Sequence, residues 1–293
     1  MAISTFIPKV WSAKLLESYE RALVIGSLCN RNYEGDIAQF GDTVHINSLA
    51  NLTVKKYTPN TDIDAPEQLS TTDQTLVIDH GAYFNVYVND VDAAQARSDL
   101  MEPAMRNAAQ RLAEDTEDYI VQKIVSEAGI NESGELKAGA VYEALVALKT
   151  KMDEKNVPKA GRYLVVPPAI EGEMLLDSRF ITANGQASET RLVNGSVARA
   201  AGFDIYVSNA LTDKMIALNQ DCVTFARQIT KTEAYRREKG FDDGVKGLSL
   251  CGAKVVLPQY TVVYTLTGAL AAKAGTPVAT AVKTNETDSK TSK

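Results

Sequence analysis

The chain has 293 residues, of which 45% are hydrophobic and 23% are charged, and it carries a formal net charge of −6 at pH 7. This is the composition of a globular protein with room for about two domains. The acidic balance excludes an overall basic surface for holding nucleic acid, so any contact with DNA is expected to be nonspecific. The three cysteines are far apart and odd in number, which predicts reduced, buried thiols.

The N-terminal residues predict an extended piece followed by an amphipathic helix. Large apolar residues recur there at three- and four-residue steps: Trp11, Leu15, Leu16, Tyr19 and Leu23. The segment lacks the basic and then apolar pattern of a signal peptide. No stretch of the chain reaches the roughly 18–20 apolar residues that a membrane span requires. We therefore expect no membrane association.

A long polar stretch, "TVKKYTPNTDIDAPEQLSTTDQ" (53–74), lies between two sequences that predict strands. Before it, Val44 and Ile46 alternate with polar residues. After it, alternation over 75–88 predicts one further strand. Ordering the polar stretch costs entropy with little burial in return, so we expect it to form an arm that lies on a neighbouring chain.

The hydrophobic period changes to that of a helix over 91–128. An apolar stripe from Met101 to Ile124 predicts a helix of about 25–28 residues, on the order of 40 Å long. The opposite side carries mostly charged residues: Arg111, Glu114, Asp115, Glu117, Asp118 and Lys123. We interpret that side as a solvated or partner-facing surface.

The rest of the chain alternates between helical and strand patterns after a turn-rich boundary at 131–139. Helices are predicted over 140–155, 169–177 and 196–201. Strands are predicted over 162–168, 203–209, 215–218, 222–228, 248–256 and 259–266. A charged tip (231–244) separates two of these strands, and the small, polar tail from residue 269 is expected to be loosely attached.

The sequence offers little for catalysis. Its two histidines, His45 and His80, lie in predicted strands, where a hydrogen-bonded structural role is expected. Motifs of the forms GxSxG, HExxH and GxxxxGK[ST] are missing, and no set of side chains has metal-ligand spacing. An enzyme with an α/β core over 136–210 remains an alternative. However, its polar residues lie along one helix and its end, which predicts a polar surface: Glu171, Glu173, Asp177 and Arg179.

The order of these parts resembles that of the major capsid proteins of tailed bacteriophages, which have the Hong Kong 97-type fold. The resemblance covers about residues 3–268 and includes "GDIAQFGDTVHI", "LAEDTEDYIVQKI", "RYLVVPPAIEGEMLLDS" and "GSVARAAGFDIYVSN". It implies an α+β chain with an N-terminal arm, an extended hairpin loop, a peripheral domain with a long spine helix, an α/β axial domain and a flexible tail. The N-terminal arm would cover 1–35 and the extended loop 36–80. The peripheral domain would combine 81–135 with 215–255, and the axial domain 136–214 with 256–268. The tail would be 269–293.

The resemblance also implies a function and partners. Family members form hexamers and pentamers of an icosahedral shell around double-stranded DNA, so we expect a virion protein that is assembled in the bacterial cytoplasm and has no catalytic, cofactor or metal site. Because the arm begins at residue 1, the chain is either already mature or uses a separate scaffolding protein. A portal and a decoration protein are further expected partners. No cross-linking motif can be aligned, so we predict non-covalent assembly. An encapsulin-like compartment of the same fold is the alternative.

Charged residues near the two tips are the candidates for contacts between subunits. They are Lys55, Lys56, Asp62, Asp64 and Glu67 in the polar stretch, and Arg236, Arg237 and Lys239 in the charged tip. Opposite charges on the two tips predict electrostatic docking between neighbours. The simpler interpretation of the second group is an exposed, charged hairpin tip.

Overall fold

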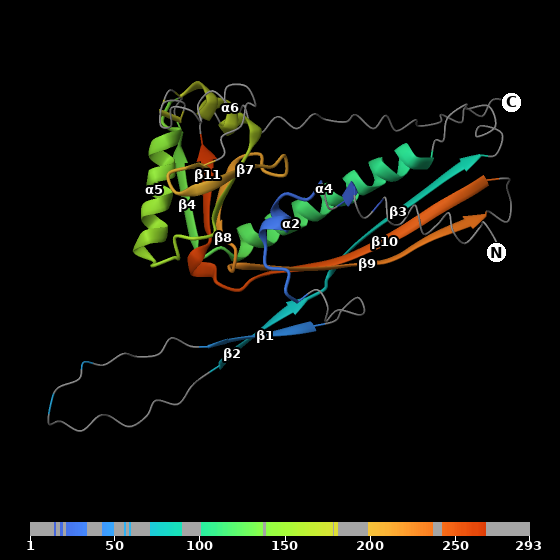
Figure 1. Ribbon diagram of the computed structural model, residues 1–293, viewed down its shortest axis with the longest axis horizontal. Coiled ribbons are helices and arrows are strands. Elements are labelled where there is room, and N and C mark those ends of the chain that lie inside the picture. The colour runs from blue at the N-terminus through green and yellow to red at the C-terminus, as the bar shows by residue number, and fades with distance from the viewer. Residues whose placement is uncertain are drawn as a thin grey trace, which may run out of the picture.

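The computed structural model describes residues 15, 18–19, 22–33, 43–49, 56, 59, 71–89, 101–136, 139–177, 179–180, 199–236 and 242–267. These residues form a two-stranded, a three-stranded and a six-stranded sheet. Figure 1 shows an elongated arrangement, in which the six-stranded sheet lies at one end and a long helix runs from it along the three-stranded sheet. The two-stranded hairpin extends below both.

The six-stranded sheet has the mixed order β4-β11-β8-β5-β7-β6. Its strands are β4 (Ile130–Glu135), β5 (Arg162–Val166), β6 (Arg199–Ala200), β7 (Phe203–Val207), β8 (Lys214–Asn219) and β11 (Val262–Thr267). The pairs β4–β11 and β5–β7 are parallel, whereas β8 runs antiparallel to both β5 and β11. A short 3-10 helix, η3 (Pro258–Tyr260), precedes β11.

Both faces of this sheet are covered at its inner strands, which explains why β5 and β8 are almost continuously apolar. On one face, Leu164 and Val166 pack against α5 (Val141–Glu154) and α6 (Pro168–Leu176). On the other, Val165 packs with residues from the end of α4 (Met101–Glu127) and from the start of β9 (Val223–Arg236). Alternate residues of a strand point to opposite faces, so one strand contributes to two cores.

The long helix α4 connects the six-stranded sheet with the three-stranded sheet, whose order is β3-β10-β9. Strands β3 (His80–Asn89) and β10 (Asp242–Val255) run antiparallel, as do β10 and β9. In its first half α4 packs Met105 and Leu112 against Val245 of this sheet. In its second half Ile120 and Ile124 enter the core beneath the six-stranded sheet.

The two-stranded sheet is a hairpin of β1 (Thr43–Leu49) and β2 (Thr71–Val77). The N-terminal segment, defined here as residues 22–33, contains the short helix α2 (Ile25–Leu28) and crosses α4. Leu15 and Tyr19 pack beside α4 in the same core as Leu23.

Several predictions from the sequence are confirmed. The long helix is present over Met101–Glu127, the helices expected at 140–155 and 169–177 are α5 and α6, and the three cysteines are free and buried. The expected strands at 162–168 and 203–209 are β5 and β7.

Four predictions about local structure are wrong. The turn-rich boundary at 131–139 contains β4, which forms because β11 supplies a parallel partner. The single strand expected over 75–88 is two strands in different sheets, since Ile78 packs with the hairpin whereas Phe84 packs towards α4. Residues 199–200 pair with β7 as a strand rather than forming a helix. Much of the charged tip is regular strand, because β9 and β10 stay paired as far as Arg236 and Asp243.

Candidate functional site: the hairpin base and an exposed tyrosine face

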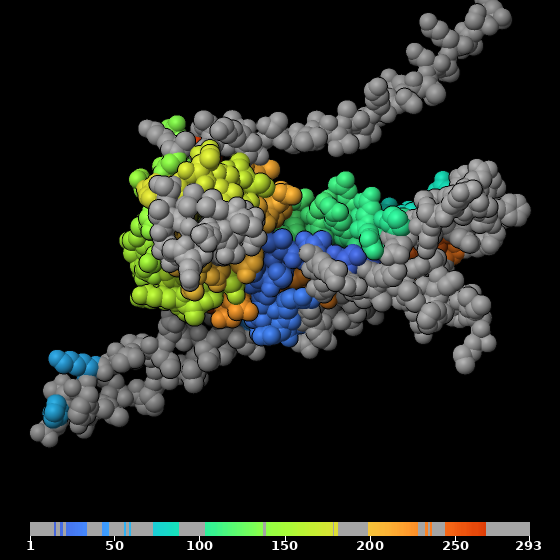
Figure 2. All heavy atoms as spheres, turned by 45° about the horizontal axis from the view of Figure 1, so that its top comes forward, coloured from blue at the N-terminus to red at the C-terminus, as the bar shows by residue number. Residues whose placement is uncertain are grey.

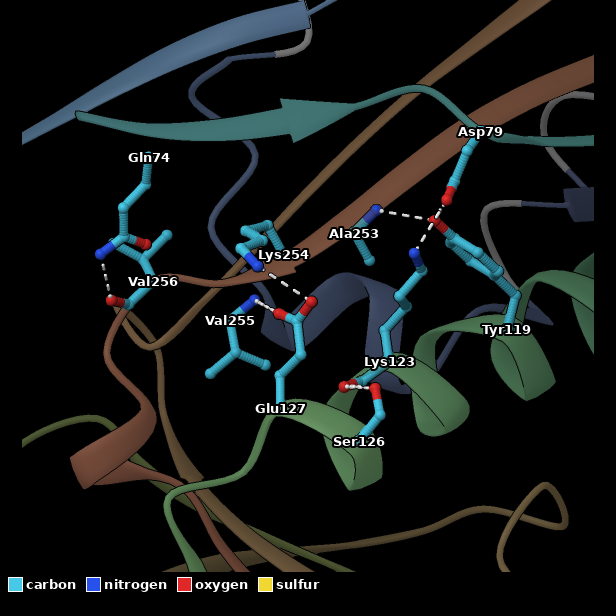
Figure 3. Close-up of polar contacts among 10 residues, drawn as sticks. All are labelled: Gln74, Asp79, Tyr119, Lys123, Ser126, Glu127, Ala253, Lys254, Val255 and Val256. Carbon is cyan, nitrogen blue, oxygen red and sulfur yellow. Dashed lines mark hydrogen bonds and ion pairs between the residues drawn. The ribbon is translucent and has the colours of Figure 1, made fainter. Parts of the chain in front are cut away.

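The base of the β1–β2 hairpin is packed tightly onto the rest of the subunit. Val44, Ile46, Leu76 and Ile78 are buried in one cluster with residues of β9 and β10, including Leu250. The side-chain amide of Gln74 donates a hydrogen bond to the carbonyl of Val256 at 3.1 Å (Figure 3). The hairpin is therefore anchored by apolar packing and by a hydrogen bond to the residue directly after β10.

Gly252 allows this close approach. A Cβ atom at this position would lie 2.4 Å from the carbonyl oxygen of Val77 and 2.9 Å from Cδ1 of Ile78. Neither backbone can yield without separating β10 from the junction between β2 and β3. A glycine is therefore required where the hairpin meets the body.

Asp79, between β2 and β3, is held by two side chains from α4 (Figure 3). The Tyr119 hydroxyl donates to Oδ1, and the Lys123 ammonium lies 2.8 Å from Oδ2. Burial raises the pKa of Asp79, but the hydrogen bonds from Lys123 and Tyr119 outweigh it and hold the pKa below its ordinary value. Burial and the bond to Asp79 both raise the pKa of Tyr119, so its proton stays in place.

A second polar contact fastens the end of α4 to β10. One Glu127 carboxylate oxygen lies 2.9 Å from the Lys254 ammonium, and the other accepts the backbone N–H of Val255 at 3.0 Å (Figure 3). A carboxylate that binds an ammonium and a backbone amide together fixes direction as well as distance. The hairpin, α4 and β10 thus meet at one rigid joint.

Both histidines have structural partners, as the sequence predicted. His80 Nε2 lies 2.6 Å from Oδ2 of Asp115, and its ring stacks on Tyr119 with centroids 4.5 Å apart. His45 Nδ1 lies 2.8 Å from Oδ2 of Asp73 across the hairpin. Neither arrangement brings a nucleophile to the imidazole.

The three-stranded sheet has one face towards α4 and one face that the described residues leave open. Along β3, Ala82, Phe84 and Val86 are half-buried, whereas Tyr83 and Tyr87 are 79% and 57% exposed. Tyr83 is paired with Leu248 of β10, which is also exposed. We call this open side the tyrosine face, and its described residues include Tyr83, Asn85, Tyr87, Glu233, Tyr235, Lys246 and Leu248.

The tyrosine face is ordered by contacts between its own side chains. Tyr235 lies over Gly244, where an added Cβ would be 2.7 Å from the ring, and its hydroxyl donates to Asn85 at 2.6 Å. Lys246 pairs with Glu233 at 3.1 Å. These contacts connect all three strands and neutralise the two described charges against each other. The described part of this face is therefore preformed, aromatic and nearly neutral, which fits a protein partner better than DNA.

The charged contact candidates are not brought together by the described residues. Lys56 is exposed, and Arg236 forms the last pair of β9 with Asp243. The side chain of Arg236 and the remaining candidates lie outside the residues whose side chains the structure describes: Lys55, Asp62, Asp64, Glu67, Arg237 and Lys239.

A family model described as phage capsid protein matches residues 71–266, which is more than half of the chain. The chain belongs to the phage capsid protein family. The match includes the tyrosine face and, apart from β1, the hairpin base, so these surfaces are parts of a capsid subunit.

Solved structures support the same assignment. A chain from Mycobacterium phage Che8 is 26% identical to this capsid protein, with a TM-score of 0.71 over 83% of this chain and 90% of that one. The capsid of cyanophage P-SCSP1u is 16% identical, with a TM-score of 0.68 over 84% and 89%. No curated protein sequence matches this chain. The fold is the Hong Kong 97 type predicted from the sequence, and the protein is a major capsid protein.

A virus-like particle from Pyrococcus furiosus shares the fold as well. It is 14% identical, with a TM-score of 0.56 over 86% of this chain and 96% of that one. Within the described part of the chain, no group of three histidine, cysteine or acidic residues is arranged to hold a metal ion. None of the described helices is long and apolar enough to span a bilayer.

Two of the four residues that a catalytic interpretation singled out, Asp177 and Arg179, have structural partners. Arg179 lies 2.8 Å from Oδ2 of Asp177 and also donates to the carbonyl of Gly139. Its guanidinium stands over the ring of Tyr142. This cluster fastens the end of α6 to the start of α5, and family membership assigns the chain a structural role.

Proposed function

We propose that this capsid protein associates through hexamers and pentamers into an icosahedral head shell that encloses double-stranded phage DNA. The observation that carries the proposal is the tyrosine face, an ordered aromatic surface with Tyr83 79% exposed on a protein whose relatives form capsids. A subunit that assembles must bury extensive surface against its neighbours. Tyrosine is enriched in such interfaces because its ring contributes area and its hydroxyl contributes hydrogen bonds.

The charged candidates supply a second set of proposed contacts. We propose that Asp62, Asp64 and Glu67 of one subunit approach Arg236 and Arg237 of the next. Each exposed pair would contribute about 0–1 kcal/mol, so the pairs would act on register more than on total affinity. Reversing the charge of both arginines should reduce particle yield more than subunit stability. Normal particles from that variant would contradict this contact map.

We propose the division into an arm, an extended loop, a peripheral domain and an axial domain as the working units of assembly. Sheet membership favours two changes to the expected boundaries. Strands β4 and β8 pair with β11, so residues 130–135 and 214–219 would join the axial unit. The proposed peripheral unit would then consist of β3, α4, β9 and β10.

The remaining partners follow from the same proposal. A separate scaffolding protein, a portal and a decoration protein would act during assembly in the bacterial cytoplasm, and packaged DNA would touch the inner face without sequence preference. We propose assembly without covalent cross-links, cofactor or metal. Denaturing gels of purified particles should then show single subunits, and ladders of linked subunits would contradict it.

Electron microscopy of the purified protein tests the function directly. Closed icosahedral shells are expected, and a protein that stays a monomer at high concentration would contradict the proposal. A cellular compartment of the same fold, the alternative from the sequence, is the second candidate, and a virus-like particle from Pyrococcus furiosus shares this fold. Shells that contain enzyme cargo and no DNA when isolated from the native source would favour that alternative.

A further inference from the structure

Glu117 of α4 is buried, although the sequence predicts a solvated or partner-facing position for it. It lies on the helix side that the sequence predicts to be solvated, yet it is only 5% exposed. Its neighbour on that side, Glu114, is exposed and pairs with Arg111 at 2.7 Å. The predicted polar side is therefore correct for Glu114 and wrong for Glu117, because the N-terminal segment covers the latter.

The Glu117 carboxylate accepts hydrogen bonds from the backbone of the N-terminal segment. Oε1 accepts the N–H of Val24 at 2.9 Å and that of Gly26 at 3.1 Å, and Oε2 accepts the N–H of Ile25 at 3.1 Å. These amides lie at the start of α2, where the first N–H groups of a helix have no carbonyl partner within the helix. Glu117 thus caps α2 from a different part of the chain, and Val24, the residue before α2, makes no side-chain cap of its own.

The same carboxylate also reaches the six-stranded sheet. The hydroxyl of Ser208, directly after β7, lies 3.3 Å from Oε2 of Glu117. Figure 2 shows the N-terminal segment, in blue, lying between α4, in green, and the yellow and orange region of the six-stranded sheet. One side chain therefore bonds to two regions that approach α4 from different parts of the subunit.

Apolar packing around the Glu117 carboxylate is less directional than its hydrogen bonds. Ile25 and Leu28 lie in one cluster with Ile120 of α4 and Ile216 of β8. Tyr19 bonds to Thr116 at 2.8 Å, and because the Thr116 hydroxyl already donates to the Leu112 carbonyl, Tyr19 is the donor. Apolar contacts hold the segment down without fixing its position along α4. Three amides that converge on one carboxylate do fix it, since a shift of the segment along α4 would break these hydrogen bonds to a buried group.

We propose that Glu117 is a positioning residue for assembly, which fixes the register of the N-terminal segment against α4 and the six-stranded sheet. A four-residue helix such as α2 is too short to be stable alone, so its geometry depends on this external cap. The effect on assembly rests on the proposed function, whereas the local effect on residues 24–26 does not. The two can therefore fail separately.

Hydrogen exchange of the purified full-length protein tests the local claim. In Glu117→Gln one side-chain oxygen remains for three amides, so exchange of the Val24, Ile25 and Gly26 amides should accelerate about tenfold or more. Exchange in β5 and β11 should change less than about twofold. The matched control is Glu114→Gln, which removes a charge from the same helix side and should leave residues 24–26 unchanged.

A second variant covers the case in which Glu117→Gln does not fold. Glu117→Asp keeps the charge and withdraws it by one methylene, so it should produce the same local acceleration. Unchanged exchange at residues 24–26 in either variant would overturn the proposal, as would an equal acceleration throughout the subunit. If the local effect is seen, electron microscopy should show a lower yield of regular particles than for Glu114→Gln. An equal yield would overturn the role in assembly and leave the proposed capsid function intact.

Discussion

The six-stranded and three-stranded sheets differ in how many of their faces the subunit covers. In the six-stranded sheet, α5 and α6 cover one face, while α4 and the start of β9 cover the other, so Leu164 and Val165 are both fully buried. In the three-stranded sheet, α4 covers one face and the described residues leave the tyrosine face open. The first sheet is complete within one chain. The second has the form of a sheet that is completed by a neighbour.

The largest expected effect comes from making the same substitution in both sheets. Leu164→Ala should lower the free energy of unfolding by about 2–5 kcal/mol, because it leaves a cavity in a core where Leu164 is fully buried. Leu248→Ala, at a residue that is 38% exposed, should cost the subunit less than about 1 kcal/mol. Urea denaturation of dissociated subunits measures both values. Equal losses would remove the distinction between the two sheets.

A substitution at the hairpin base should have the second-largest effect on subunit stability. Gly252→Ala would place a methyl group 2.4 Å from the Val77 carbonyl oxygen, so it should cost about 1–3 kcal/mol and speed hydrogen exchange in β2. Gly172→Ala in α6 is the control, because an added Cβ there meets no atom within 4 Å. That substitution should be neutral or stabilise the subunit by up to about 1 kcal/mol. A Gly252→Ala subunit as stable as the wild type would show that the hairpin is not held as described.

The smallest effect is the pH dependence of the Asp79 contact. Its pKa in the folded subunit lies below that of the unfolded chain, so the contact stabilises the fold above the unfolded pKa. This contribution is lost as the pH falls through the folded pKa. Because Asp79 is partly exposed, the change should stay below about 1 kcal/mol. Asp79→Asn should flatten the stability profile between about pH 5 and pH 2 relative to wild type, and an identical profile would contradict the assignment.

The sequence was sufficient to predict those helices and strands whose apolar residues follow a regular pattern. Repeated apolar spacing in α4 and α5, and the continuous apolar run of β5, were sufficient because local pattern and burial agree there. It failed at β4, whose polar sequence becomes a strand only because β11 lies beside it. It also missed the break between β2 and β3 at Ile78 and Asp79, since both strands alternate and only their tertiary partners differ.

The candidate site was less predictable than the fold. Glu117 and Glu114 have similar positions in the sequence pattern, and only the crossing of the N-terminal segment separates a buried carboxylate from a solvated one. Tyr83 and Tyr87 alternate with apolar residues as in any half-buried strand, so sequence alone does not identify their face as open. Composition alone predicted the contacts of the charged tips, and these contacts remain predictions.

We propose that the tyrosine face is buried between copies of the capsid protein in the assembled particle. Hydroxyl-radical footprinting of dissociated subunits and of assembled particles measures it directly, with the fully buried Tyr19 as an internal reference. We predict that Tyr83 and Tyr87 are labelled strongly in subunits and several-fold less in particles, while Tyr19 stays low in both. Equal labelling of Tyr83 and Tyr87 in the two states would show that this face is not buried on assembly.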